Sequence, residues 1–238
     1  MTEPHRFLVS EPLAKPGEYL LGPEESRHAA RVLRLRVGDA VTLFDGRGRF
    51  GAAAIAAVDG DGVAARIDEI REDSRPSVSL TVATAVPKGK RWRILIEKCT
   101  ELGADRIVAV RFDRSVAKAE GDQGKWRRWA VEAAKQSRRA RLPEMQGPLD
   151  LAGAVALAGR DGAVLLVASP DGDSPRSYAD ALAASGKALV LIGPEGGMTD
   201  GELERCRREG AAAVRLSPFV LRVETAAAAA CTLIQNAV

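Results

Sequence analysis

Two loops near the end of the chain, both bearing glycine or proline, hold the residues best placed to bind a ligand. The first, LIGPEGGMTDGELE, covers residues 191–204 and sets Gly193, Gly196 and Gly197 between an apolar run and a helix start. Glycine adopts positive φ easily and lets other groups approach the backbone, so such a loop can hold a flat, uncharged ring. The alternative is a plain turn between a strand and a helix, since glycines are common in loops.

The spacing of these glycines excludes the two common phosphate-binding loops. The stretch GPEGGM matches neither the GxGxxG of dinucleotide sites nor the GxxxxGKS or GxxxxGKT of Walker loops. Thr199 and Glu202 have the T-x-x-E spacing of a capping box, which predicts a helix that begins near Asp200. Gly210 is the expected C-cap of that helix, so the three glycines lie in the loop before it.

The second loop, LSPFVLRVETAAAAA at residues 216–230, also follows an apolar strand and enters a helix. Arg222 and Glu224 flank the start of that helix, and the alanine run allows close packing against another backbone. The alternative is a structural ion pair at the start of a buried helix. Two such loops in succession favour a shared crevice more strongly than either loop alone.

Alternating strands and helices surround both loops. Apolar runs such as SLTVATAV, RIVAVRF, AVLLVAS, ALVLIG and AAVRLS alternate with helical stretches such as RWRILIEKCTELG, GKWRRWAVEAAKQSRR and DGELERCRREG. Apolar strands between helices are typical of an α/β layer with a mostly parallel sheet. Ligands of such sheets bind beyond the carboxyl ends of the strands, where both loops lie. We therefore predict a ligand-binding α/β domain at residues 74–238.

Residues 1–73 have a different pattern, of short strands broken by Gly and Asp. RFLVS, VTLFDGRGRFGAAAIAAV and GVAARIDEI are strand-like runs, with DGRG at residues 45–48 as a hairpin turn. One helix is expected in PEESRHAARVLR, whose acidic residues precede its basic ones. The polar stretch REDSRPSVSL at residues 71–80 marks a domain edge. This pattern predicts a small β-barrel with one helix.

Charge and composition narrow the class of partner. The net charge is only +3, but residues 88–141 contain 16 basic and 7 acidic residues. This density favours a nucleic acid partner, with a solvated helix surface as the alternative. The three cysteines are far apart and neither His5 nor His28 belongs to a Cys/His cluster, so no metal site is expected. The start lacks a signal-peptide pattern and no apolar run of about 18 residues occurs, which predicts a cytoplasmic protein without a membrane partner.

Several motifs in order resemble one known family. LIGPEGGMTDGELE followed by VRLSPFVLRVETAAAAA is similar to the C-terminal signature of the SPOUT methyltransferases that methylate uridine N3 in 16S ribosomal RNA. RFLVS, HAARVLRLRVGD and LFDGRG resemble the family's N-terminal PUA-like barrel. PKGKRWRILIEKCTELGAD, FDRSV and EAAKQSRRARLPEM resemble its central motifs, so the resemblance covers nearly the whole chain.

The resemblance implies a fold, a cofactor and an assembly. SPOUT domains are α/β folds with a deep C-terminal trefoil knot, an exception to the rule against threaded chains. They bind S-adenosylmethionine in the knot loops and act as homodimers. The resemblance thus implies an RNA-binding PUA-like β-barrel at residues 1–73 and a SPOUT methyltransferase domain at residues 74–238. The implied cofactor-binding residues are Ala168, Gly193, Pro194, Glu195, Gly196, Gly197, Leu216, Ser217, Leu221 and Arg222.

Two positions depart from the family pattern. Arg138 stands in QSRR where the family often has Gly, and Lys90 stands in KGKR where an acidic residue is frequent. Both changes add positive charge.

The implied reaction places a methyl group on N3 of uracil, and the N3 proton must leave. Either a base takes this proton, or a cation stabilises the anion on O2 and O4. Arg222 is the candidate for stabilising the anion, and Glu224 for orienting Arg222 or accepting the proton. The alternative is that Glu224 only caps its helix and holds Arg222 in place.

RNA contacts are expected from the basic residues, because Arg holds phosphates bidentately and stacks on splayed bases. Arg27, Arg31 and Arg34 would share one face of a helix. The predicted RNA-binding residues are Arg6, Arg27, Arg31, Arg34, Arg36, Lys88, Arg91, Arg114, Arg138, Arg139 and Arg141. For any one of them the alternative is a solvated surface residue. The predicted partner is 16S rRNA or the small ribosomal subunit.

Two other functions stay open from the sequence. One is a different SPOUT RNA methyltransferase, acting on tRNA or on a ribose 2′-OH. The other is a non-catalytic RNA-binding factor with a degenerate knot. The N-terminal barrel and the LRVETA form favour uridine N3, and the intact GPEGG favours an enzyme.

Overall fold

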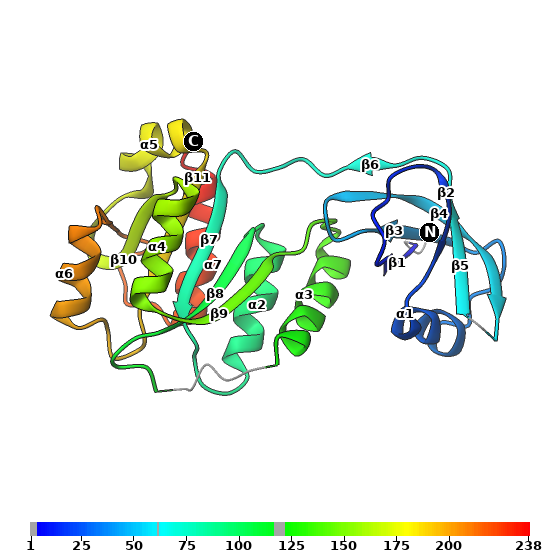
Figure 1. Ribbon diagram of the computed structural model, residues 1–238, viewed down its shortest axis with the longest axis horizontal. Coiled ribbons are helices and arrows are strands. Elements are labelled where there is room, and N and C mark those ends of the chain that lie inside the picture. Colours follow the sequence, from blue (N-terminus) through cyan, green and yellow to red (C-terminus); the bar gives the residue numbers. More distant parts are fainter. Residues whose placement is uncertain (1–3, 61, 117–121) are drawn as a thin grey trace. The chain divides into compact units, whose positions relative to one another are not determined.

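The computed structural model describes residues 4–60, 62–116 and 122–238, and the chain forms two compact units (Figure 1). The first unit contains residues 1–74 together with residues 134–142. The second contains residues 75–133 and 143–238. The first junction lies one residue from the predicted boundary. Residues 134–142 differ from the prediction, because they pack with the first unit although the sequence places them inside the α/β domain.

The first unit is built on one six-stranded sheet. Its strands are β1 (His5–Leu8), β2 (Gly17–Leu20), β3 (Ala40–Phe44), β4 (Arg49–Asp59), β5 (Gly62–Ile67) and β6 (Arg71–Glu72). The order is β1-β3-β4-β5-β2, with β6 beside β4. Among the described strand pairs of this first sheet, β1–β3 is parallel and the other four pairs are antiparallel. Side chains such as Phe7, Leu43 and Ile55 alternate into one buried core. The predicted small β-barrel domain is confirmed.

The helix and the hairpin of this unit follow from local sequence. Helix α1 (Pro23–Arg27) continues directly into the π-helical segment η1 (His28–Val32), so the predicted helix is present but ends two residues early. Asp45 shapes the predicted hairpin turn between β3 and β4. Its Oδ1 accepts hydrogen bonds from the backbone N–H groups of Arg47 (2.7 Å) and Arg49 (3.0 Å).

Residues 134–142 belong to the first unit because they pack against this hairpin turn. The backbone N–H of Leu142 donates to the carbonyl of Gly46 at 2.9 Å. Ala140 is fully buried and packs with Phe44, the last residue of β3. These contacts join stretches of chain that are far apart in sequence, which is why the domain prediction missed them.

The second unit is an α/β layer around a parallel sheet. Its strands are β7 (Ser79–Ala85), β8 (Arg106–Arg111), β9 (Glu144–Asp150), β10 (Val164–Asp173), β11 (Lys187–Ile192) and β12 (Ala212–Val214). Its helices are α2 (Arg91–Glu101), α3 (Gln123–Ser137, whose last residues lie in the first unit), α4 (Leu151–Asp161), η2 (Pro175–Tyr178), α5 (Ala179–Ser185), α6 (Asp200–Arg208) and α7 (Val223–Gln235). The strand order is β12-β10-β11-β7-β8-β9, and every pair is parallel among the described residues.

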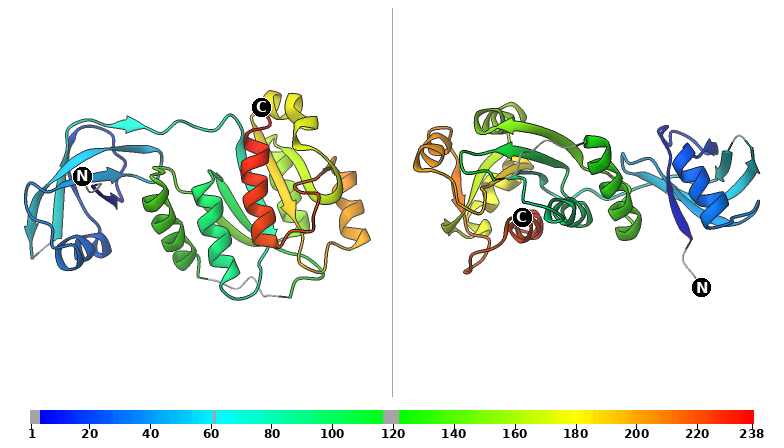
Figure 2. Two further views of the ribbon diagram at one scale, coloured as in Figure 1. Left: turned by 180° about the vertical axis from the view of Figure 1, so that it is seen from behind. Right: turned by 90° about the horizontal axis from the view of Figure 1, so that it is seen from below.

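Helices cover both faces of this sheet. Side chains of α2 and α7 form one buried cluster with the sheet, and side chains of α4 and α6 form a second cluster with its other face. Figure 1 shows α4 in front of the sheet. The left view of Figure 2, which looks from the opposite side, shows α2 and α7 in front of the sheet. The alanines of α7 let this helix approach β7 closely, as the alanine run predicts.

The end of β10 crosses β12 at very short range. Val214 of β12 pairs with both Ala168 and Asp173 of β10, with an irregularity between the two pairings. Gly172 is buried at this crossing, and a Cβ atom placed there would lie 2.6 Å from the backbone of Ala213 and Val214. No side chain fits between the two segments, so this glycine is a steric requirement of the fold.

Candidate functional site

A cavity of about 360 Å³ lies where β10 and β11 end. Its walls come from the end of β10, the loop at 193–198 and the loop at 216–221. This is the crevice at the carboxyl ends of parallel strands that the sequence predicts. Eight of the ten predicted cofactor-binding residues line it: Ala168, Gly193, Pro194, Glu195, Gly197, Leu216, Ser217 and Leu221. Gly196 and Arg222 do not line the cavity.

The three glycines of the first loop differ in their need for glycine, and only Gly193 and Gly197 have a steric or backbone reason for it. Gly197 has φ +72°, which side chains rarely adopt. Gly193 has ordinary φ, but a Cβ atom there would lie 2.8 Å from Cγ of Met198. Gly196 also lacks positive φ, and its Cα faces the side chain of Arg114, 3.5 Å from a Cβ atom placed on it. Of these three glycines, only Gly197 therefore uses the positive φ that glycine allows.

The predicted capping box is present, and it reaches beyond its own helix. Thr199 is the N-cap of α6, its side chain accepts a hydrogen bond from the N–H of Glu202, and Glu202 accepts one from the N–H of Thr199 at 2.8 Å. Glu202 is buried, with 7% of its surface exposed, and its second oxygen accepts a hydrogen bond from the N–H of Asp113 at 2.8 Å. Burial, with the nearby charge of Glu202, raises the pKa of Cys206 to about 11.

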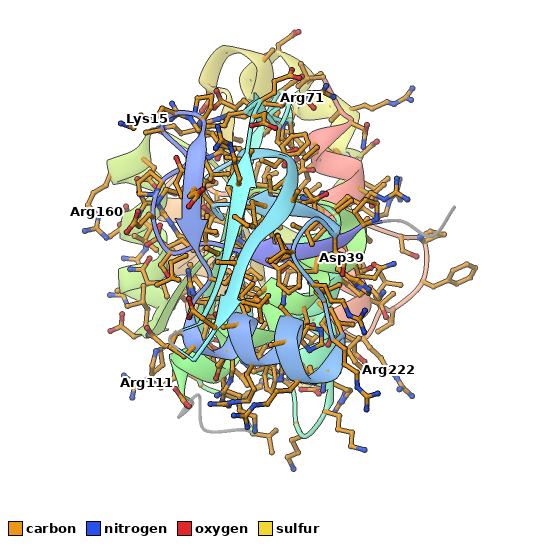
Figure 3. The ribbon with its side chains drawn as sticks, turned by 90° about the vertical axis from the view of Figure 1, so that its right-hand side faces the viewer. Lys15, Asp39, Arg71, Arg111, Arg160 and Arg222 are labelled. Carbon is orange, nitrogen blue, oxygen red and sulfur yellow. The ribbon has the colours of Figure 1, made fainter. Side chains whose placement is uncertain are left out.

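Arg222 and Glu224 do not form the ion pair that was the structural alternative. Arg222 is the N-cap residue of α7, and its exposed side chain points outward in Figure 3. Glu224 lies in the first turn of α7 and is half-buried. Its Oε2 is buried without a hydrogen-bond partner among the described residues. A buried carboxylate oxygen of this kind is costly unless another group pairs with it.

The second loop carries two large apolar side chains that the sequence reasoning did not select. Phe219 is 78% exposed and Val220 is 91% exposed, and both line the cavity. Ser217 holds their turn, because its Oγ accepts a hydrogen bond from the N–H of Phe219 at 3.0 Å. The available signal was an apolar FV pair within a loop that also contains Ser and Pro.

The predicted RNA-binding residues of the first unit have different surroundings. Arg27, Arg31 and Arg36 are exposed, as is Arg34, which lies beyond the helix with φ +54°. The prediction of a shared helix face is wrong for Arg34, because the helical segment ends at Val32.

Two further arginines of this unit pack against other groups. The guanidinium of Arg6 lies 5.4 Å from the ring centre of Phe44 and 5.7 Å from that of Phe50. Arg141 is mostly buried, and its guanidinium lies so close to Gly48 that any side chain there would collide with it. Both side chains thus have structural contacts within the unit.

The remaining predicted residues also separate into two groups. Lys88 and Arg138 are exposed, and Arg139 is half-buried. Arg91 and Arg114 contact the first loop: Arg91 pairs with Glu195 at 3.0 Å, and Arg114 donates to the carbonyl of Gly196 at 3.0 Å. These two are therefore engaged at the rim of the cavity.

Neither a metal-binding cluster nor a membrane-spanning helix is found in the described part of the chain. No group of three or more His, Cys, Asp or Glu side chains is arranged to hold a metal ion there. No helix in residues 4–60, 62–116 or 122–238 is both long enough and apolar enough to cross a membrane.

The fold and the cavity define the class: a parallel α/β layer of the SPOUT trefoil-knot type with a site at the carboxyl ends of its strands, together with a PUA-like barrel. Residues 74–235 match the RNA methyltransferase domain family, and residues 21–68 match the RNA methyltransferase PUA domain. The chain belongs to the ribosomal RNA small subunit methyltransferase E family.

Relatives in this family match over most of their length. The chain is 39% identical to ribosomal RNA small subunit methyltransferase E of Mycobacterium tuberculosis over 217 residues, covering 87% of this chain and 82% of the relative. The protein of the same name from Bacillus subtilis is 28% identical, with 92% and 90% covered. The crystal structure of this enzyme from Neisseria gonorrhoeae, bound to S-adenosyl methionine, has a TM-score of 0.84 and 26% identity, with 98% and 97% covered.

Proposed function

We propose that this protein transfers a methyl group from S-adenosylmethionine to N3 of a specific uridine in 16S ribosomal RNA. The single observation that carries the proposal is the cavity at the ends of β10 and β11, walled by the two predicted loops in a chain of this family. The cofactor supplies an activated methyl group when bound. The chain must bind it, position the base, and help the N3 proton to leave.

The residues around the cavity fit this cofactor. A cavity of about 360 Å³ is within the usual range for small-molecule sites, about 300–1,000 Å³. Leu216 and Leu221 offer apolar surface for the adenine, and the backbone of residues 193–197 offers polar groups. Gly197 has positive φ, which favours glycine, so no side chain covers the backbone at this position.

Arg222 and Glu224 are the proposed catalytic residues. Uracil N3–H is a weak acid, so loss of its proton needs a base, a cation near the oxygens, or both. The exposed guanidinium of Arg222 can stabilise negative charge on the base. The partnerless Oε2 of Glu224 can accept the N3 proton or a hydrogen bond from Arg222 once RNA is bound. Geometry in the free protein does not exclude either role, because catalytic contacts often form only in the complex.

The substrate base must be unpaired or extruded, since N3 lies on its Watson–Crick edge. The exposed arginines of the first unit and Lys88 are the proposed phosphate contacts. We further propose that two copies pair, because Phe219 and Val220 expose apolar surface beside the cavity. We also propose a cytoplasmic location, because the proposed substrate is rRNA, either naked or in the small ribosomal subunit.

Two measurements test the function. Calorimetry should detect binding of S-adenosylmethionine to the folded wild-type protein. Mass-spectrometric mapping of 16S rRNA from a deletion strain should reveal a missing uridine N3-methyl group, restored by the wild-type gene and not by Glu224→Ala. Loss of a tRNA methyl group or of a ribose 2′-O-methyl group instead would overturn the substrate assignment.

A further inference from the structure

The rim of the cavity at Glu195 and Gly196 is held by two arginines from other parts of the chain. Arg91 begins α2, and its Nη1 lies 3.0 Å from Oε1 of Glu195. Arg114 lies in the loop after β8, and its Nη1 donates to the carbonyl oxygen of Gly196 at 3.0 Å. The side chain of Arg114 also runs against Gly196, where a Cβ atom would lie 3.5 Å from Arg114, an ordinary contact distance. Arg91 thus contacts the side chain of Glu195, and Arg114 contacts the backbone of the next residue, Gly196.

The far end of the same loop is fastened to the same neighbour. The carboxylate of Glu202 accepts one hydrogen bond from the N–H of Thr199 and another from the N–H of Asp113, each at 2.8 Å. The hydroxyl of Thr199 lies 3.2 Å from Oδ2 of Asp113. Because Glu202 is almost fully buried, the two hydrogen bonds to its carboxylate are partly shielded from water and are stronger for it. The loop after β8 therefore contacts the glycine loop at Gly196 and again at Thr199, where the loop ends.

A loop with glycines at 193, 196 and 197 needs such fastening to keep one shape. Glycine has more backbone freedom to lose on ordering than any other residue. A ligand that binds a loose loop must order it, and its affinity falls accordingly. A loop that is already held in place binds more tightly.

The same contacts make these two arginines poor phosphate ligands. Arg91 already faces the carboxylate of Glu195, and Nη1 of Arg114 already donates to the carbonyl of Gly196. An RNA phosphate approaching Arg91 meets the negative charge of Glu195, and one approaching Arg114 competes with the carbonyl of Gly196 for the guanidinium. Lys88 is exposed, close by in sequence, and has no ion pair recorded in the described part of the chain.

We infer that Arg91 and Arg114 are positioning residues for the methyl-donor loop rather than RNA contacts. The inference rests on the proposed function for the identity of the ligand, but the fastening itself is independent of it. It divides these three basic residues by role: Arg91 and Arg114 act on cofactor affinity, and Lys88 acts on RNA affinity.

The test uses Arg91→Ala, Arg114→Ala and the matched control Lys88→Ala in the full-length protein, since each removes one positive charge. S-adenosylmethionine affinity is measured by calorimetry, and affinity for a 16S rRNA fragment by filter binding at one fixed salt concentration. A charge-assisted hydrogen bond predicts that Arg114→Ala raises the cofactor Kd about 10-fold. The partly exposed pair predicts about a 2- to 5-fold rise for Arg91→Ala. Lys88→Ala should leave the cofactor Kd unchanged and weaken RNA binding more than either arginine variant.

Further variants and a hydrogen-exchange measurement separate loss of the loop contacts from loss of charge alone. Arg114→Lys retains one donor and should recover part of the cofactor affinity, and Glu195→Gln combined with Arg91→Ala should cost no more than either change alone. Hydrogen exchange in residues 193–199 should speed up in Arg114→Ala while the rest of the second unit is unchanged. Normal cofactor affinity and exchange, with RNA affinity lost, would overturn the inference. If the wild-type protein binds no S-adenosylmethionine, the proposed function fails, and the exchange measurement still decides whether the arginines hold the loop.

Discussion

Arg34 follows the helical segment of the first unit in a backbone conformation that glycine usually adopts. Its φ is +54°, and the N–H of Leu35 donates to the carbonyl of Ala29 at 3.0 Å, a hydrogen bond that closes the end of the π-helical segment. Among the described residues only Arg34 and Arg138 combine positive φ with a side chain. Strain of this kind is kept where a side chain has a function, so we predict that Arg34→Gly stabilises the protein and weakens RNA binding.

The size of the gain follows from two opposing contributions. A non-glycine residue in this conformation costs about 1–2 kcal/mol. Glycine returns about 0.4–1 kcal/mol of this through the greater freedom of its unfolded chain. Arg34→Gly is therefore expected to raise the free energy of unfolding of the first unit by about 0.5–1 kcal/mol. The same direction is expected for Arg138, whose φ is +62°.

Arg31→Gly is the matched control, because it removes the same charge from the helical segment η1, where φ is ordinary. Glycine inside a helix is unfavourable, so this variant should lower the free energy of unfolding by about 0.5–1 kcal/mol. Urea denaturation, with hydrogen exchange of β3 and β4 as a local reporter, measures both variants. Both should lower RNA affinity. Equal destabilisation by Arg34→Gly and Arg31→Gly would refute the reasoning, since it would mean that contacts of the Arg34 side chain outweigh its backbone strain.

Three further predictions concern the second unit. Gly172→Ala should lower the free energy of unfolding by about 1–3 kcal/mol, because its Cβ would lie 2.6 Å from the backbone of β12. Gly201→Ala has no neighbour within 4 Å and should be neutral or stabilising in the same denaturation assay. Glu202→Gln should cost about 1–3 kcal/mol in that assay, because its amide nitrogen cannot accept the second of two backbone N–H bonds, and equal stability would contradict this. Thiol labelling at pH 8 should modify no cysteine in the native protein and all three in denaturant. The reason is that all three thiols are buried and that the pKa of Cys206 is raised to about 11. Rapid labelling of one thiol in the native protein would instead show that the structure opens locally.

Local sequence signals account for much of this fold. The capping box joins residues only three apart, and the hairpin turn at 45–48 is shaped by the side chain of its own Asp45, so both are visible in the sequence. Strand and helix periodicity likewise identifies the two units and the parallel sheet. Strand β9 was missed, because its stretch EMQGPLD is polar and contains Gly147 and Pro148. Such a composition is tolerated at the edge of the sheet, where β9 pairs only with β8. Helix α4 was missed because a short apolar run does not distinguish a helix from a strand.

The roles of the arginines could not be assigned in this way. Sequence position makes Arg91, Arg114 and Arg141 equivalent basic residues of one charged stretch. Their surroundings depend on which distant segments the fold brings together: Arg114 reaches a carbonyl 82 residues away, and Arg141 packs against Gly48 in the hairpin turn of the first unit, to which Arg141 itself belongs. A net charge is a sum over composition, whereas the partner of a charged side chain is set by contacts between distant segments. The amino-acid types thus determined that the chain would form two units, a crevice and a basic surface, and only the tertiary structure decided which cations contact the glycine loop and which do not.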